Sequence, residues 1–138
     1  MRVEVERRLL QAVVAAACLV PLLAGLAGIV EGPAMLRGGA PTSPDLDSHL
    51  RYLSGLLLGI GLAFLSCVPR IEANGRLFRL LGAIVMVGGL ARLASLLAVG
   101  APGPEHQLAL GMELGVVPAL MLWQARIERR WLVRETVQ

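Results

Sequence analysis

Apolar residues in this chain gather into four long stretches instead of alternating with polar residues. The stretches cover residues 9–30, 50–68, 77–99 and 107–125. Each is close to the ~20 residues that an α-helix needs to cross the hydrocarbon core of a bilayer. Connections rich in glycine, proline or charge separate them, and these cover residues 31–48, 69–76 and 100–106. The pattern predicts four transmembrane helices, followed by a short polar tail over residues 126–138.

Composition agrees with a membrane environment. Of the 138 residues, 56% are hydrophobic and only 4% are aromatic, and the mean hydropathy is +0.69. A soluble domain of this size has too little interior to hide so much apolar surface, whereas lipid removes the need to hide it. The first stretch is too long for a signal peptide and no small-residue cleavage site follows it, so we expect it to be retained. We therefore predict one all-α domain over residues 1–138, a four-helix bundle running up-down-up-down.

The arginines predict the orientation of this bundle, because cytoplasmic loops carry an excess of positive charge. Ten arginines fall at one side of the predicted bundle, and Arg37 alone falls at the other. Both termini are therefore expected in the cytoplasm, with the protein in the inner membrane of a bacterium and surrounded by membrane lipids. The formal charge of +3 does not indicate nucleic-acid binding, because the arginines cluster at helix ends with little aromatic interleaving. The ten are Arg2, Arg7, Arg8, Arg70, Arg76, Arg79, Arg126, Arg129, Arg130 and Arg134.

Small residues at four-residue spacing predict close helix contacts. They are found in the pairs Gly55 and Gly59, Gly111 and Gly115, and Ala91 and Ser95. The main interpretation is packing inside the bundle; the alternative is contact with a second copy or with a larger membrane complex. Pro21 and Pro118 lie inside predicted spans and should kink the first and fourth helices.

Two charged residues lie inside apolar stretches. Arg92 and Glu113 are each about seven residues from the loop that joins the third and fourth helices, which is roughly 10 Å at the helical rise. In an antiparallel hairpin turning at Pro102 and Gly103, the two residues face each other. An unpaired arginine near the middle of a membrane costs about 2.5–3.5 kcal/mol. We therefore predict an ion pair between Arg92 and Glu113.

The second stretch begins with more polar residues. Asp47 is expected to cap the helix, with His49, Arg51 and Tyr52 in its first turns. His49 and Tyr52 share a helix face because they are three residues apart. Asp47 and Arg51 are four residues apart, and the simplest interpretation of Arg51 is a surface ion pair with Asp47.

These residues form one predicted polar cluster at the outer level of the bundle. Its members are Arg92, Glu113, Arg51, Tyr52 and His49, with Glu31, Ser95, His106 and Gln107 as additions. Three interpretations stay open: charges that only fix helix register, a pocket for a lipid-soluble or small molecule, and a surface that docks an accessory subunit onto a larger complex. In an enzymatic version, an isomerase or cyclase, Glu113 acts as general acid or base.

No cofactor or metal site is expected. His49, His106 and Glu113 are too dispersed for a metal centre. Cys18 and Cys67 lie in apolar segments with no CxxC spacing, and we interpret them as buried small hydrophobes.

Four segments resemble those of a small bacterial inner-membrane family, the domain of unknown function 4345 family. The segments are DSHLRYLSGLLLGIG, CVPRIEANGRLFR, GGLARLAS and ELGVVPALMLWQ. The similarity runs from the first helix to Trp123, and its most specific part is the run from Asp47 to Gly61 together with Pro69, Arg70, Arg92 and Glu113. The resemblance implies a four-helix membrane protein with a shared polar set. It implies no activity, substrate or cofactor.

Overall fold

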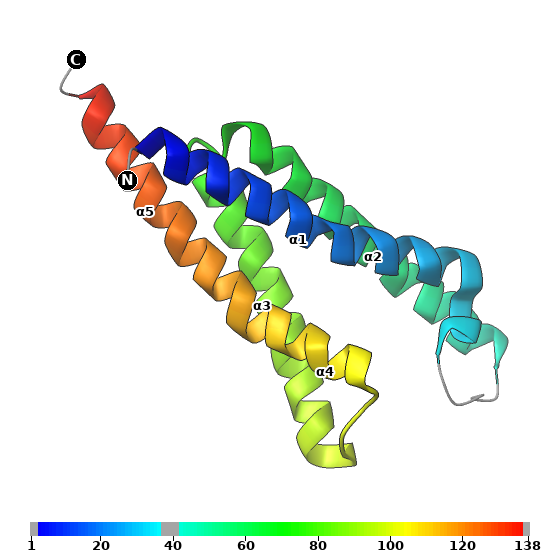
Figure 1. Ribbon diagram of the computed structural model, residues 1–138. Helices are drawn as coiled ribbons and strands as arrows, with labels where there is room; N and C mark the ends of the chain where they lie inside the picture. The colour runs from blue at the N-terminus through cyan, green and yellow to red at the C-terminus, as the bar shows by residue number, and fades with distance from the viewer. Residues whose placement is uncertain (1–2, 37–41, 137–138) are drawn as a thin grey trace. The chain divides into compact units, whose positions relative to one another are not determined.

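The computed structural model describes residues 3–36 and 42–136, and this part of the chain is helical without a β-strand (Figure 1). The α-helices are α1 (Val3–Glu31), α2 (Pro44–Cys67), α3 (Gly75–Val99), α4 (Pro104–Gly111) and α5 (Val117–Glu135). Short 3₁₀ turns follow α1 and α2 at Gly32–Met35 and Val68–Arg70, and a π-helical segment, Met112–Val116, joins α4 to α5.

Four helical stretches are long and apolar enough to cross a membrane, and each contains one of the predicted apolar stretches. They are Val3–Met35, Pro44–Arg70, Gly75–Val99 and Pro104–Arg134. Large apolar side chains on them remain exposed; Leu97 is 78% exposed and Leu122 74%. Contact of such side chains with water is unfavourable, whereas contact with lipid tails has no such cost. The all-α class and the four membrane-spanning helices are thus as predicted from the sequence.

The chain divides into two compact units. One contains residues 13–66, and the other contains residues 1–12 and 67–138. In the first unit, α1 and α2 pack closely at three glycines. A methyl group built on Gly25 would lie 2.9 Å from the Leu58 Cβ, and one on Gly61 would lie 3.2 Å from Pro21. Gly28 leaves the same kind of space for Ser54.

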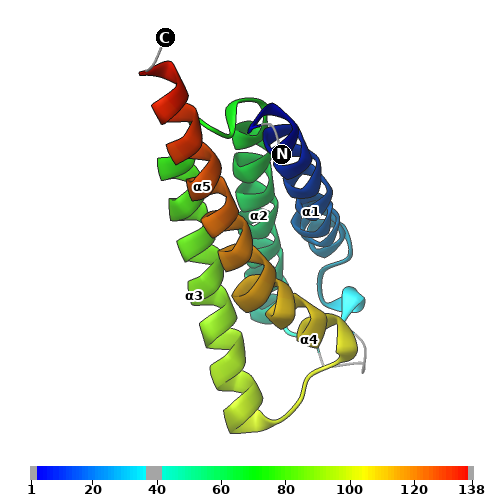
Figure 2. The ribbon, with the colours of Figure 1, turned by 60° about the vertical axis from the view of Figure 1, so that its left-hand side comes forward.

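In the second unit, α3 packs against α5 and the π segment through a line of glycines (Figure 2). Gly75, Gly82 and Gly89 are spaced seven residues apart, so they lie on one face of α3 after every two turns. Methyl groups built on them would overlap the side chains of Glu128, Met121 and Leu114 respectively. The partner numbers fall as the glycine numbers rise, so the two helices run antiparallel and their backbones approach closely.

The glycine pairs that the sequence analysis emphasised do not make these contacts. Apart from the adjoining residues and the backbone of its own helix, no described atom lies within 4 Å of a methyl group built on Gly55, Gly59, Gly111 or Gly115. Ala91 and Ser95 are both exposed. The prediction that these pairs mediate close packing is therefore wrong for contacts inside each unit. A four-residue spacing places two glycines on one face, but it does not say which face meets a neighbour.

Helix α2 begins earlier than predicted. The Ser43 hydroxyl accepts a hydrogen bond from the Leu46 amide at 3.1 Å, so Ser43 caps the helix and Pro44 is its first residue. Asp47 lies one turn inside α2, and its predicted role as the cap is wrong. The tail after Ala125 continues α5 as far as Glu135. Both cysteines are buried and neither forms a disulfide.

Candidate functional site

Arg92 and Glu113 form the predicted ion pair in a two-point geometry. The Arg92 Nε donates to Glu113 Oε2 at 3.0 Å, and Nη2 donates to Oε1 at 3.1 Å. A planar guanidinium that meets both carboxylate oxygens makes one of the stronger charge-assisted contacts in proteins. The side chains are 34% and 19% exposed respectively. The pair is therefore partly accessible and is not sealed inside the unit.

Gly89 allows this pair to form at short range. It is buried on α3 one turn before Arg92, and a methyl group built on it would lie 2.9 Å from the Glu113 Cβ and 2.8 Å from Leu114. Any larger residue would push the π segment away from α3. The close approach of the two backbones sets how far Arg92 must reach.

The π segment positions Glu113. The Val117 amide donates to the carbonyl of Met112, five residues back, where an α-helix would use the residue four back. Pro118 follows at once; it has no N–H for the Leu114 carbonyl, and its ring would collide with that carbonyl in a regular helix. A wider turn before Pro118 relieves this conflict. Glu113 therefore lies on a local irregularity of the fourth span, a feature that recurs at functional sites.

His106 adds a third polar group. Its Nδ1 lies 3.5 Å from the Arg92 Nη1, at the limit of a hydrogen bond. Arginine can only donate, so Nδ1 accepts, and the proton of a neutral His106 ring is then on Nε2. From the sequence, His106 is expected only as an addition to the cluster. The structure places it on the same guanidinium as Glu113.

The loop before α4 holds His106 in this position. The Gly103 carbonyl accepts hydrogen bonds from the amides of His106, at 3.0 Å, and Gln107, at 3.2 Å. The Gln107 side chain donates to the Pro102 carbonyl at 2.8 Å. Gln107 therefore supports the loop and is not part of the Arg92–Glu113–His106 contact. Ser95 is exposed, and it has no hydrogen bond to any of these three residues.

In the other unit, Arg51 has a structural role. Its Nε donates to Asp47 Oδ2 at 2.9 Å, which is the simple ion pair predicted from the sequence. Its Nη1 also donates to the carbonyls of Ile29 and Val30, the latter at 3.2 Å, near the end of α1. A cation near the C-terminal end of a helix satisfies free carbonyls and offsets the helix dipole. Arg51 thus ties the end of α1 to the start of α2.

His49 and Tyr52 are exposed on α2, and Tyr52 is 63% exposed. Neither has a hydrogen bond or ion pair within the part of the chain that the structure describes. The predicted cluster thus falls into two groups, one in each unit: Arg92 and Glu113 with His106, and Arg51, which pairs with Asp47, with His49 and Tyr52. Their assembly into one site stays a prediction.

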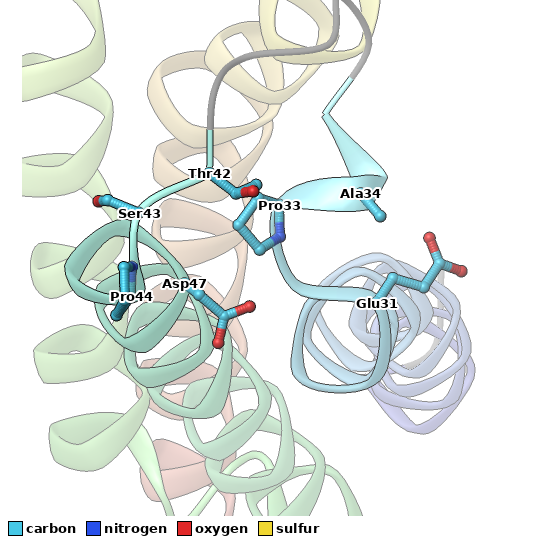
Figure 3. Close-up of a pocket in the computed structure, with 7 residues that line it drawn as sticks. All are labelled: Glu31, Pro33, Ala34, Thr42, Ser43, Pro44 and Asp47. Atoms are coloured by element: carbon cyan, nitrogen blue, oxygen red, sulfur yellow. The ribbon is translucent and has the colours of Figure 1, made fainter.

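A shallow recess lies where the first unit's two helices are joined (Figure 3). Its volume is about 470 Å³, and the close-up shows the Glu31 carboxylate pointing away from Pro33 and Asp47. Glu31 was named as an addition to the polar cluster, but here it borders an open surface. No predicted ligand-binding residue lines the recess, whose members are Glu31, Pro33, Ala34, Thr42, Ser43, Pro44 and Asp47.

Sequence reasoning missed two buried polar residues at the arginine-rich end of the second unit. Glu6 is 4% exposed and pairs with Arg126 and Arg130, and Gln124 is fully buried and donates to the Ile71 carbonyl at 3.0 Å. A signal was present, because Glu6 precedes Leu10, Val14 and Cys18 at four-residue spacing, and all of these are buried.

Arg2 and Arg37, which entered the predicted orientation, lie outside the described residues. No group of three or more His, Cys, Asp or Glu side chains able to hold a metal occurs in residues 3–36 and 42–136.

Comparison with known proteins agrees with the resemblance seen in the sequence. No curated protein and no solved structure matches the chain. A family model, described as Domain of unknown function (DUF4345), matches residues 9–124. That range includes the first three apolar stretches and all but the last residue of the fourth, together with Arg51, Arg92 and Glu113. This chain belongs to the DUF4345 family.

Proposed function

We propose that this protein is a multi-pass protein of a bacterial inner membrane that binds a lipid-soluble or small molecule at Arg92 and Glu113. In this proposal the helices run up-down-up-down with both termini in the cytoplasm. Arg92, Glu113 and His106 form an outer-leaflet site, and the prediction from the sequence adds Arg51, Tyr52 and His49 as further ligand-binding residues. The observation that carries the proposal is the two-point Arg92–Glu113 pair with His106 on the third edge of the guanidinium.

Two features favour binding over a purely architectural pair. An ion pair that only fixes helix register needs two residues, whereas Arg92 also faces an imidazole that can accept or donate. The Arg92 side chain is 34% exposed, so a polar group of a ligand can reach the guanidinium. Ionisable residues inside membrane spans mark functional sites more often than they mark simple architecture.

The ligand chemistry follows from the groups that meet it. Arg92 binds a carboxylate or another oxygen-rich group, while the apolar faces of the surrounding helices suit a hydrocarbon body. Glu113 and His106 together also supply an acid and a base on one guanidinium, which favours an isomerase or cyclase as the second candidate function. Product formation by the bound ligand would distinguish this enzyme from a binding protein.

The test is native mass spectrometry of the protein extracted from its own membrane in polymer-bounded discs. Wild type is compared with Glu113→Gln, which keeps the shape of the side chain but removes its charge. Glu105→Gln is the matched control, because Glu105 is exposed at the start of α4 and has no ion pair among the described residues. We expect wild type and Glu105→Gln to retain the same small molecule, and Glu113→Gln to lose it.

Equal retention by all three proteins would remove Glu113 from the site. Stoichiometric protein partners with no retained small molecule would support the accessory-subunit interpretation and reduce the pair to architecture.

A further inference from the structure

A line of arginines follows the apolar part of α5. Arg126, Arg130 and Arg134 are spaced four residues apart, and Arg129 lies three residues after Arg126. Residues three and four apart are neighbours on a helix surface. We call these four residues the α5 arginine stripe. It begins where the apolar stretch ends at Ala125, which is where a spanning helix reaches the headgroup layer.

Acidic side chains neutralise only part of this stripe. Glu6 pairs with Arg126, with 3.4 Å between Oε1 and Nε, and also with Arg130. Arg129 and Arg134 are exposed and have no ion pair with any side chain that the structure describes. Among the side chains that the structure describes, four guanidinium groups therefore share one carboxylate, and the stripe keeps a positive excess.

The stripe also has hydrogen-bond donors to spare. Each guanidinium has five N–H donors in a planar fork, and the Arg126 side chain remains 68% exposed beside Glu6. Phosphate oxygens accept from such a fork at two points, which lysine cannot match. The chemistry of the stripe fits a phosphate group.

Apolar residues beside the stripe indicate what carries the phosphate. Leu132 and Val133 are 56% and 64% exposed on the same part of α5. Trp131 lies under the Arg7 guanidinium, 5.3 Å from ring centroid to Cζ, so one face of its ring is covered. Nucleic-acid binding uses several aromatic faces for base stacking, whereas Trp131 is the only aromatic residue after Trp123 and Arg7 already occupies one of its faces. Exposed aliphatic side chains beside a cationic line fit acyl chains beside a headgroup.

We propose that the α5 arginine stripe binds the headgroup phosphate of an anionic phospholipid. This site is separate from the Arg92–Glu113 site: its residues lie at the opposite end of the α3–α5 pair, at the level where Arg79 meets Glu128. Surface attraction of basic residues to anionic lipid is worth about 1 kcal/mol per arginine, so removing two should weaken binding roughly thirtyfold.

The experiment titrates phosphatidylglycerol into full-length, delipidated protein in a neutral detergent and reads lipid adducts by native mass spectrometry. The variant is Arg129→Gln with Arg134→Gln, which spares both partners of Glu6. The control is Arg70→Gln with Arg76→Gln, which removes the same charge from exposed arginines outside α5 that have no ion pair with a described side chain. Phosphatidylcholine and soluble glycerol phosphate are titrated in parallel.

We expect the α5 variant to bind phosphatidylglycerol about thirtyfold more weakly than wild type, and the control only a few-fold more weakly. Neither phosphatidylcholine nor glycerol phosphate should bind comparably. Equal losses in the two variants would show a diffuse surface potential and overturn the site. Equal binding of glycerol phosphate would show a free-phosphate site and overturn the lipid assignment, as would displacement of the lipid by an RNA oligonucleotide.

Discussion

At the scale of single residues, Gly32 is a position that tolerates little change. It adopts a φ of +57°, a conformation that favours glycine. A methyl group built on it would lie 2.7 Å from Asp47 Oδ1 and 2.8 Å from Arg51 Nη2. The Asp47–Arg51 ion pair, whose arginine also bonds to carbonyls at the end of α1, thus passes directly over a glycine that no residue with a Cβ can replace without strain.

Replacing Gly32 with alanine should therefore destabilise the protein. The backbone conformation alone costs a residue with a Cβ about 1–2 kcal/mol, and displacement of the Asp47–Arg51 contact adds to this. We expect Gly32→Ala to lower the free energy of unfolding by about 2 kcal/mol, measured by thermal or denaturant unfolding in lipid discs. Gly55→Ala is the control; its methyl group meets no atom of its unit, and we expect no loss and a gain of up to about 1 kcal/mol. A Gly32→Ala protein as stable as wild type would contradict this role.

The residue scale also shows what the sequence could predict of the site. The Arg92–Glu113 pair was predictable, because an unpaired arginine in an apolar helix is costly and only one acidic residue lay at matching depth. The hydrogen bonds from Arg51 to the carbonyls of Ile29 and Val30 were not predictable, because every residue has a backbone carbonyl and the sequence does not show which one is used. The contact between Arg92 and His106 depends on how the loop 100–103 turns, which the sequence leaves open.

At the scale of helices, the fourth span is the least regular part of the structure. Pro118 predicts a kink in the fourth helix, and the structure has a π segment over Met112–Val116, directly before this proline. Pro21, by contrast, lies within α1, which is α-helical throughout. The same residue type produces a π segment in one helix and not in the other, so the sequence alone could not place the irregularity. Glu113 owes its position to it.

Replacing Pro118 with alanine should weaken the coupling between Arg92 and Glu113. Alanine restores an N–H for the Leu114 carbonyl and lets the segment close into a regular α-helix, which turns Glu113 by about 100° relative to α5. The measurement is a double-mutant cycle with Arg92→Leu and Glu113→Leu, read as unfolding free energies. We expect a coupling of about 1–3 kcal/mol in wild type and a value near zero in the Pro118→Ala background.

Pro21→Ala is the control for that cycle, and it should leave the coupling unchanged because no π segment precedes Pro21. An unchanged coupling in Pro118→Ala would show that the π segment does not position Glu113.

Helix packing shows the same division between what was predictable and what was not. The sequence contains several glycine pairs, and the four-residue spacing drew attention to Gly55 with Gly59 and to Gly111 with Gly115. The contacts are instead made by Gly75, Gly82 and Gly89, whose seven-residue spacing also keeps one face. Both patterns are consistent with close packing, and only the position of the neighbouring helix decides between them.

At the scale of the whole molecule, hydropathy predicted the most. In lipid, a stretch of about 20 apolar residues must form a helix, because only then are its backbone N–H and C=O groups hydrogen-bonded within the segment. The structure has four helices of that kind. Their ends were less predictable: α2 starts at Pro44 because Ser43 caps it, and α5 runs through the polar tail to Glu135. In the second unit, the charged side chains form two groups: the single ion pair between Arg92 and Glu113, and several ion pairs close together at the arginine-rich end.

The central claim is that Arg92 and Glu113 bind a ligand and do more than hold two helices together. Exchanging the charges, Arg92→Glu with Glu113→Arg, separates these roles, because a reversed pair still satisfies itself but presents the opposite polarity to a ligand. We would measure unfolding free energy and ligand retention by native mass spectrometry for the double variant and both single variants. The account predicts that the double variant recovers most of the stability that each single variant loses and still retains no ligand. Retention of the wild-type ligand by the double variant would contradict the account and leave the pair as architecture.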